Sequence, residues 1–600
     1  MKDAAAYTLL ILATTALAAC SSLPAAPPVA TAATPTGEGS VPRYDEVVRQ
    51  SLYVPVRDGT RLAMNIYRPA ERGRAVETPL PVIFAFTPYR ARYREENGET
   101  VEAGLSERLG LKGMTDHGYV VAVADIRGKG ASFGTRRGFQ DRTEAQDGHD
   151  LVEWLAAQPW SDGNVGMVGC SYLGGTTIQT ASTAPPHLRA VFTGATDFDK
   201  YTFVRRGGIT AQFNTRPDEP LSWDLASLPV DADRDGTLLR QAVEQHSGNT
   251  PMADLWYSMP YRDSISPHTG TRFWEEVGPY TYADTLRNNG VQYYLWVTWK
   301  DEPAEQILTA AANLPARVMI GPGSHCEAPP GVDLGAEQRR FFDRHLKGIR
   351  NGIDEEPRYR WWTLDAPAGE EWTRSDRLPG DGVDRHILFL DDGPSGTVRS
   401  LNDGALVAQR PDDGADSYRV DYDVEGQDYF PFWPAVLDER GLTYTSPPLA
   451  RDVVLTGSPV VHLRVSADQD DTNLFVFLEE VDGQGRAENI SFGRLALSHR
   501  AMAEPPYDNR GLPWHSGRSA DVEPAVPGTA YSVSFALTPN SKRFRAGSRI
   551  RVSVRGADPR QRNLREIRRD PPETVTVHHG AGASRVEIPF LEAPVFAASE

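Results

Sequence analysis

The segment Gly169-Cys170-Ser171-Tyr172-Leu173-Gly174 could present a serine hydroxyl as a nucleophile. It follows a short apolar run, 165–168, and precedes a helix-like stretch, 176–181. A sharp strand-to-helix turn holds its central serine in a strained conformation, and small neighbours let strand and helix approach closely. The usual pattern is Gly-x-Ser-x-Gly, whereas Leu173 stands at the second glycine's place. A turn that merely closes a βα unit is the alternative, so the motif needs partners elsewhere in the chain.

A serine nucleophile needs a base within hydrogen-bond reach and a carboxylate behind that base. In α/β folds of this kind the chain order is serine, acid, histidine, and the sequence supplies it. Asp301 follows an apolar run at 293–297, and His325 follows another at 317–320. Both are predicted to lie at the carboxyl ends of strands, where open α/β sheets place their sites. Glu302 is the rival to Asp301, and an ordinary surface role is the alternative for His325.

The oxyanion that forms when Ser171 attacks a carbonyl needs two donors. The backbone N–H of Tyr172 is the first candidate. The second is the hydroxyl of Tyr89, which follows the apolar run 81–86. The residues alone leave open whether Tyr89 is instead a packed tyrosine beside a turn proline.

The elements that must position these residues form a βα series in the first half of the chain. Residues 52–67 alternate around Asp58-Gly59, which is typical of a hairpin. Buried strands that alternate with helices predict a mostly parallel sheet. The predicted strands are 81–86, 119–124, 165–168, 190–192, 293–297 and 317–320, with a helix at 144–157.

An inserted helical cap is predicted for residues 198–287, which lack a strand pattern. Within it, 231–236 is similar to the opening of a calcium-binding loop. Ala242 stands where that loop needs a glutamate ligand, so a solvated acidic helix start is predicted instead.

From residue 358 onward, short alternating strands predict an all-β domain of jelly-roll type. The predicted fold class is therefore α/β: an α/β-hydrolase domain with an inserted helical cap and a C-terminal all-β jelly-roll domain. The predicted catalytic domain comprises 42–197 and 288–357, the cap 198–287 and the jelly roll 358–600.

The first twenty residues are predicted to be a lipoprotein signal peptide, since an apolar stretch ends in Leu17-Ala18-Ala19-Cys20. The interpretation implies lipidation of Cys20 and location in the periplasm or at the outer membrane of a bacterium. A plain secretory signal is the alternative, and either one exports the protein. Residues 21–41, rich in Pro, Ala and Thr, are predicted to be a flexible tether.

Composition narrows the classes of partner. A net charge of −18 argues against nucleic acid. No metal or cofactor is expected, and membrane attachment is expected only through a lipid on Cys20. The chain has three cysteines, so Cys170 and Cys326 are the sole pair left for a disulfide, and the sequence leaves open whether they pair. It also leaves open whether the protein is a homo-oligomer.

Several motifs together resemble the CocE/NonD hydrolases, a group that includes cocaine esterase, glutaryl-7-aminocephalosporanic acid acylase, α-amino acid ester hydrolases and X-Pro dipeptidyl-peptidases. The motifs are the segment 169–175, the preceding 160–166, Asp125-Ile126-Arg127-Gly128 with its continuation to Gly134, and 342–348. The resemblance implies a hydrolase domain, a cap and a jelly roll. It implies that Ser171, Asp301 and His325 are a triad, and that Tyr89 and the Tyr172 amide form an oxyanion hole.

This chain departs from the family pattern at informative positions. The family's Trp-x-Asp spacing selects Asp301 over Glu302. Around His325 the family reads Gly-Pro-Trp-x-His-Gly, whereas this chain has Gly323 for the tryptophan and Cys326 for the last glycine. Amino-ester hydrolases carry an acid three positions after the nucleophile, where this chain has Gly174, so an α-amino acid ester is disfavoured.

The sequence thus predicts an exported serine hydrolase that cleaves a small-molecule ester or amide through an acyl-enzyme. An X-Pro dipeptidyl-peptidase is the alternative, and it would need an acid for the substrate's free amine, with Glu302, Asp254 and Asp263 as candidates. A third hypothesis is a non-catalytic lipoprotein that binds the cell envelope.

Overall fold

The computed structural model describes residues 39–211, 216–396, 400–424, 433–561, 568–580 and 584–597. The predicted signal peptide and nearly all of the predicted tether lie outside these residues. Ser40, inside the predicted tether, already contacts the folded chain: its backbone N–H and its hydroxyl donate to Asp343 at 2.7 and 2.8 Å. Among the helices of the described ranges, none is long and apolar enough to cross a bilayer.

The first sheet has eleven strands, parallel in the centre and antiparallel at both edges. Its order is β1-β2-β7-β4-β8-β9-β10-β11-β12-β13, and β3 pairs with β2. These strands are β1 (Glu46–Pro55), β2 (Arg61–Glu71), β3 (Arg74–Ala75), β4 (Leu80–Thr87), β7 (Val120–Asp125), β8 (Ser161–Cys170), β9 (Leu188–Gly194), β10 (Gln292–Thr298), β11 (Ala316–Gly321), β12 (Tyr359–Trp362) and β13 (Trp372–Ser375). A small hairpin, β5 (Arg92–Arg94) with β6 (Thr100–Glu102), stands apart. The predicted hairpin and parallel strands are confirmed.

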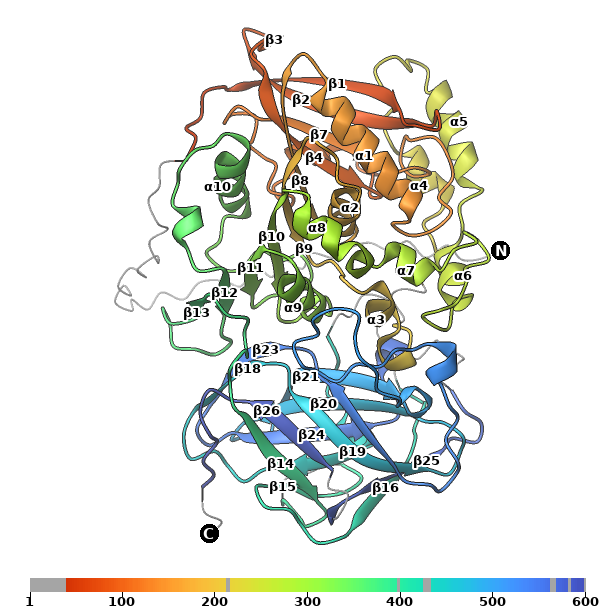
Figure 1. The fold of residues 1–600 in the computed structure, drawn as a ribbon, viewed down its shortest axis with the longest axis vertical. Coiled ribbons are helices and arrows are strands. Elements are labelled where there is room, and N and C mark those ends of the chain that lie inside the picture. The colour runs from red at the N-terminus through yellow and green to blue at the C-terminus, as the bar shows by residue number, and fades with distance from the viewer. Residues whose placement is uncertain are drawn as a thin grey trace, which may run out of the picture. The chain divides into compact units, whose positions relative to one another are not determined.

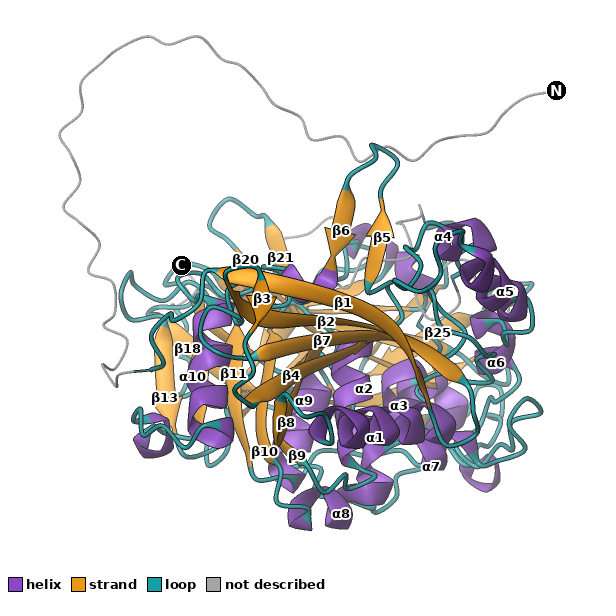
Figure 2. Ribbon diagram, turned by 90° about the horizontal axis from the view of Figure 1, so that it is seen from above, coloured by secondary structure: helices purple, strands orange, loops and turns teal. Residues whose placement is uncertain are grey.

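Both faces of this sheet are covered, because successive side chains of a buried strand point to opposite sides. In β4, Phe84 and Phe86 pack into one apolar cluster, and Ile83 and Ala85 pack into another. The first cluster includes residues of α1 (Arg142–Ala156), α2 (Tyr172–Ala181) and α9 (Ala304–Asn313), and the second includes residues of α10 (Leu334–Leu346). Figure 1 shows α10 apart from α1 and α2, and Figure 2 shows α1 and α2 beside the strands β4 and β8. The α/β fold class is confirmed.

The chain between β9 and β10 contains helices and no strand in its described residues. The helices are α3 (Lys200–Val204), α4 (Leu221–Leu225), α5 (Thr237–His246), α6 (Met252–Tyr257), α7 (Phe273–Val277) and α8 (Ala283–Asn288). The Asp233 carboxylate accepts hydrogen bonds from the N–H groups of Leu238 and Leu239, at 3.1 and 2.9 Å. The calcium-like segment therefore precedes a helix start, as predicted, but Asp233 is buried against that start and does not lie in solvent.

The second sheet also has eleven strands, antiparallel except where β15 pairs with β17. Its order is β16-β25-β19-β26-β14-β15-β17-β24-β20-β21, and β22 pairs with β19. These strands are β14 (Arg385–Asp391), β15 (Gly404–Val407), β16 (Ala415–Arg419), β17 (Leu442–Thr445), β19 (Val460–Ala467), β20 (Asn473–Val481), β21 (Ala487–Ala496), β22 (Tyr531–Ala536), β24 (Arg549–Arg555), β25 (Thr574–His578) and β26 (Arg585–Pro589). A separate pair joins β18 (Val453–Gly457) to β23 (Asn540–Phe544). The C-terminal region is β-rich, as predicted.

The hydrogen bonding differs from the predicted domain boundary at one point. Strands β12 and β13 follow residue 357, the predicted end of the catalytic domain, yet they extend the first sheet. Val318 of β11 pairs with Tyr359 of β12 in a parallel register. Short alternating strands look the same in either sheet, so the pattern of residues 359–362 does not reveal which sheet they join.

Candidate active site

Ser171 stands in the turn between β8 and α2. Its φ is 62° and its ψ is −127°, a conformation that costs an L residue roughly 1–3 kcal/mol. Two backbone hydrogen bonds of 3.0 Å hold it: the Ser171 N–H donates to Gly194, and the Gly175 N–H donates to the Ser171 carbonyl. The turn therefore has the geometry that the sequence predicts for a nucleophile elbow.

The irregular glycine spacing has a structural reason. A Cβ atom at Gly169 would collide with the backbone of Leu173, and one at Gly174 would collide with the carbonyl oxygen of Gly194. Gly169 lets α2 fold back over β8, and Gly174 lets it pack against β9. The Leu173 position faces an apolar cluster instead, so it needs no glycine.

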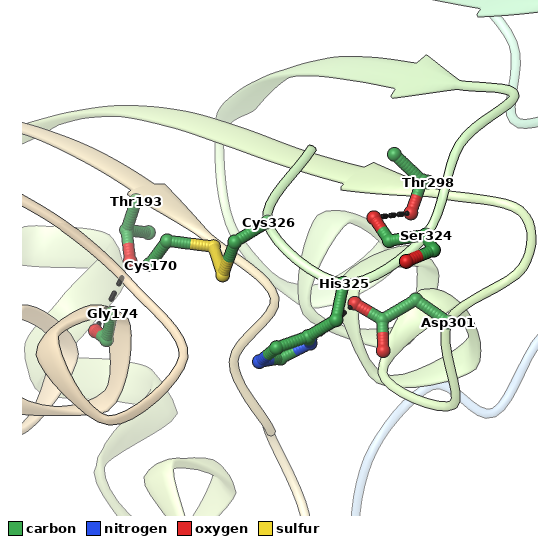
Figure 3. Close-up of a disulfide and its surroundings, with 8 residues drawn as sticks. All are labelled: Cys170, Gly174, Thr193, Thr298, Asp301, Ser324, His325 and Cys326. Carbon is green, nitrogen blue, oxygen red and sulfur yellow. Dashed lines mark hydrogen bonds and ion pairs between the residues drawn. A yellow bond between two sulfur atoms is a disulfide. The ribbon is translucent and has the colours of Figure 1, made fainter. Parts of the chain in front are cut away.

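Asp301 and His325 are brought together at the ends of β10 and β11 (Figure 3). His325 Nδ1 lies 2.9 Å from Asp301 Oδ2. The Asp301 side chain is fully buried, whereas the His325 side chain is 18% exposed. Burial raises the pKa of Asp301, and the neighbouring imidazole opposes that rise. A carboxylate on Nδ1 fixes the orientation of the ring and leaves Nε2 for another partner.

Tyr89 lies beside the serine turn. Its hydroxyl is within hydrogen-bonding reach of the Ser171 side chain and of the Tyr172 backbone. Burial of the phenol raises the pKa of Tyr89 above its ordinary value, even though 40% of the residue's total surface is exposed. With its pKa raised, Tyr89 remains a hydrogen-bond donor at neutral pH.

Asp125, the last residue of β7, fixes the loop that carries Tyr89. Its carboxylate accepts from the N–H of Ala91 at 2.6 Å and from the N–H of Ala131 at 2.9 Å. Burial raises the pKa of Asp125 to about 7, against the lowering effect of those two donors. The sequence places this residue within a family motif but predicts no role for it. Its one signal was that it follows an apolar run, as the predicted site residues do.

Cys170 and Cys326 form a disulfide, which answers the question that the sequence left open (Figure 3). Their Cα atoms are 6.0 Å apart, although 156 positions separate them in the chain. Cys170 immediately precedes Ser171, and Cys326 immediately follows His325. The bond therefore brings the backbone of the serine turn close to the backbone of the histidine loop.

Glu302, the alternative to Asp301, forms ion pairs with arginines of the β-rich region. Its Oε1 accepts from Arg494 of β21 at 3.1 Å and from Arg560 at 2.9 Å. Burial would raise the pKa of Glu302, but Arg494, Arg560 and Arg206 lower it below its ordinary value. Glu302 thus joins the two parts of the fold next to Asp301. No local sequence pattern signals these long-range partners.

The predicted site residues of the catalytic domain all lie at one edge of the first sheet. Ser171 and Tyr172 follow β8, Tyr89 follows β4, Asp301 follows β10 and His325 follows β11. Since these strands are parallel, their carboxyl ends meet at the same edge. Cys20, the predicted lipidation site, lies outside the described residues.

Two family models match the chain in succession. Residues 58–327 match the X-Pro dipeptidyl-peptidase (S15 family) model, and residues 351–584 match the X-Pro dipeptidyl-peptidase C-terminal non-catalytic domain. The first match spans Tyr89, Ser171, Asp301 and His325. The chain is therefore a serine hydrolase, of the esterase or X-Pro dipeptidyl-peptidase kind.

Individual relatives carry names of both kinds, serine esterase and Xaa-Pro dipeptidyl-peptidase. A protein named "Putative serine esterase" from Mycobacterium bovis is 28% identical over 93% of this chain and 98% of its own length. Cocaine esterase from a Rhodococcus species is 24% identical over 84% of this chain and 90% of its own. A CocE/NonD family hydrolase from Staphylococcus aureus shares the fold, with a TM-score of 0.67 at 18% identity over 91% of this chain and 94% of that one. The resemblance to the CocE/NonD serine hydrolases is confirmed.

Proposed function

We propose that this protein is an exported serine hydrolase that cleaves an ester or amide through an acyl-enzyme on Ser171. The observation that carries the proposal is the 2.9 Å hydrogen bond between buried Asp301 and His325, at the same sheet edge as the strained serine turn. Together the three residues have the chain order and the strand positions of a Ser-Asp-His triad.

The acyl transfer follows from these contacts. Asp301 keeps the proton of His325 on Nδ1, so Nε2 accepts the proton of Ser171 as its oxygen attacks the acyl carbon. The carbonyl oxygen becomes an oxyanion, which receives hydrogen bonds from the Tyr89 hydroxyl and the Tyr172 N–H. His325 then gives its proton to the leaving oxygen or nitrogen, and the scissile bond breaks. A water molecule, deprotonated by His325, releases the acyl group and restores Ser171.

The three acids predicted as partners for a substrate amine favour a substrate without one. Glu302 is bound by two arginines, and the Asp263 carboxylate accepts from the N–H and the hydroxyl of Ser519, both at 2.8 Å. Asp254 is exposed on the first turn of α6. The three acids that sequence analysis offered for an ammonium group are thus engaged elsewhere or lie at the surface, and Gly174 offers no fourth. An X-Pro dipeptidyl-peptidase remains the second candidate, because both matched models carry that description.

The remaining parts of the fold take supporting roles in the same proposal. Residues 198–287 form a helical cap over the site, and the C-terminal region is a jelly roll without catalytic residues. The helical insertion between β9 and β10 and the non-catalytic description of residues 351–584 support these assignments. The signal peptide would direct export, and a lipid on Cys20 would hold the mature enzyme at the cell envelope.

A substrate panel tests the proposal. We expect p-nitrophenyl esters to be turned over with a higher kcat/KM than X-Pro p-nitroanilides, and Ser171→Ala to lose turnover of both. Ser532→Ala, exposed in β22 of the second sheet, serves as the control and should keep wild-type activity. Faster turnover of the X-Pro anilides would establish the peptidase instead. Full ester activity of Ser171→Ala would overturn the proposal.

A further inference from the structure

We infer that the Cys170–Cys326 disulfide is a positioning device that holds His325 against Ser171, so that the enzyme works fully only while this bond is oxidised. The inference rests on the proposed function, because that function gives Ser171 and His325 their roles.

The topology of the sheet makes such a link useful. Ser171 follows β8 and His325 follows β11, and the strands β9 and β10 lie between them. Backbone pairing therefore does not join the strand of the nucleophile directly to the strand of the base. The disulfide makes this connection covalently, between the residue before Ser171 and the residue after His325.

The other side of the histidine loop is held by β10. The Thr298 hydroxyl donates to the Ser324 carbonyl at 2.8 Å, and the Lys300 N–H donates to Gly323 at 3.3 Å. With the Asp301–His325 hydrogen bond, these contacts fix the loop relative to the acid. The disulfide fixes the histidine loop relative to Ser171 (Figure 3). The loop is thus attached separately to the acid and to the nucleophile.

The local sequence of the loop supports this role. Cys326 has a φ of 57°, in the left-handed region where glycine is at ease and other L residues are not. Gly323, two residues before His325, offers no side chain that could anchor the loop. The loop therefore holds a cysteine in a strained conformation, and the bond to Cys170 accounts for that residue.

The sulfur atoms lie on the core side of the site. Cys170 and Cys326 pack against the apolar cluster that contains Leu173, Phe192 and Met319. Both cysteines are partly buried, and each is the immediate chain neighbour of a proposed catalytic residue. The bridge therefore anchors the serine turn and the histidine loop to the same part of the core.

Reduction supplies a direct test. Dithiothreitol breaks the S–S bond, each sulfur gains one hydrogen, and the reagent is oxidised to its cyclic disulfide. The freed loop lets His325 leave its place. We expect kcat for an aryl ester to fall by about tenfold to a hundredfold, the range expected for a misplaced catalytic group, with little change in KM. Oxidised glutathione should restore kcat.

A double variant separates the bond from the backbone. Cys170→Ala/Cys326→Gly removes the disulfide and gives position 326 a residue that readily adopts a positive φ. Any loss of kcat in this variant is therefore due to the missing disulfide. We expect this variant to have the circular dichroism spectrum of the wild type and the kcat of the reduced wild type. Neither dithiothreitol nor oxidised glutathione should change its kcat. The rate at which a fluorophosphonate labels Ser171 should fall in parallel.

The outcomes are distinguishable from failure of the proposed function. If the oxidised enzyme hydrolyses no ester and Ser171 is not labelled, the proposed function fails. If the oxidised enzyme is active and kcat stays within about twofold after reduction, with the mass gain of two hydrogens verified, the inference is overturned. Should the double variant fail to fold, the reversible loss and recovery of kcat in the wild type decides. Should the native bond resist dithiothreitol, the double variant decides.

Discussion

The position of the Tyr89 hydroxyl is set by hydrogen bonds of the loop that carries it. Its hydroxyl faces Ser171, and the loop behind it is fixed by Asp125 through the Ala91 N–H. The donor is therefore preorganised before any oxyanion forms. Preorganised donors act without the cost of reorienting during the reaction, which is why each contributes several kcal/mol to catalysis.

Replacing the tyrosine tests this role. We expect Tyr89→Phe to lower kcat by about 10²–10³-fold, with little change in KM, because one of two oxyanion donors is lost. Since burial raises the pKa of Tyr89, wild-type activity should show no loss from its ionisation as the pH approaches the ordinary value of 10.0. Steady-state kinetics over this pH range measure both effects. Tyr531→Phe, in β22 of the second sheet, is the matched control, and equal losses in the two variants would contradict the assignment.

At the scale of single residues, the sequence predicts which polar residues belong to the site, because these residues directly follow apolar runs. Ser171, Asp301, His325 and Tyr89 all follow predicted strands, and the structure brings them to one edge. The pairing of Cys170 with Cys326 could not be predicted, because their separation depends on the order β8-β9-β10-β11, which no local pattern contains. The contacts of Asp125 were missed for the same reason.

Among the elements, the loop after β10 supplies one buried contact between the catalytic domain and the β-rich region. Glu302 and its partners Arg494 and Arg560 are buried there. A buried ion pair gives little net stability, but removal of one partner leaves an uncompensated charge. The loop that carries Asp301 therefore depends on the second sheet.

A cycle of variants measures this dependence. We expect Glu302→Gln to reduce the free energy of unfolding by about 3–5 kcal/mol, and Glu302→Gln combined with Arg494→Met to reduce it less. The exposed pair Lys300–Glu488 spans the same two parts of the fold at 3.0 Å, so Lys300→Gln is a suitable control with a loss below about 1 kcal/mol. Urea unfolding gives the values. A loss in Glu302→Gln no larger than in the control would refute the argument.

The same residue gives a dependence on pH. The pKa of Glu302 is lower in the folded protein than its ordinary 4.5, so its stabilising effect is present above pH 4.5 and is lost as the pH falls through the folded pKa. Wild-type melting temperature should therefore drop more steeply than that of Glu302→Gln on acidification below pH 4.5. Parallel curves for the two proteins would show that Glu302 does not titrate in this way.

The sequence predicts well those elements whose apolar residues recur at a regular spacing. The hairpin 52–67, the parallel strands and the start of α5 are confirmed, since each is specified by its own residues. The ends of domains are specified less well. Strands β12 and β13 alternate as the later strands do, and only their hydrogen bonds assign them to the first sheet.

For the molecule as a whole, the remaining prediction concerns its attachment to a membrane. The signal-like segment 1–20, which ends in Cys20, predicts a lipid-anchored protein. The proposed chemistry of residues 58–327 does not depend on that anchor. We expect wild-type protein to incorporate radiolabelled palmitate and to fractionate with membranes. Cys20→Ala should incorporate none and be released from membranes, with unchanged kcat on aryl esters. Membrane fractionation that is the same in both proteins would contradict lipidation at Cys20.

The central claim is that Ser171 is a nucleophile activated by His325 and Asp301. Treatment of the folded protein with a fluorophosphonate, followed by peptide mass analysis, tests it most directly. The account predicts one adduct, on Ser171, formed far more slowly in Asp301→Asn because the imidazole loses its orienting carboxylate. Absence of an adduct on the folded wild type, or equal labelling of Ser171→Ala, would contradict it.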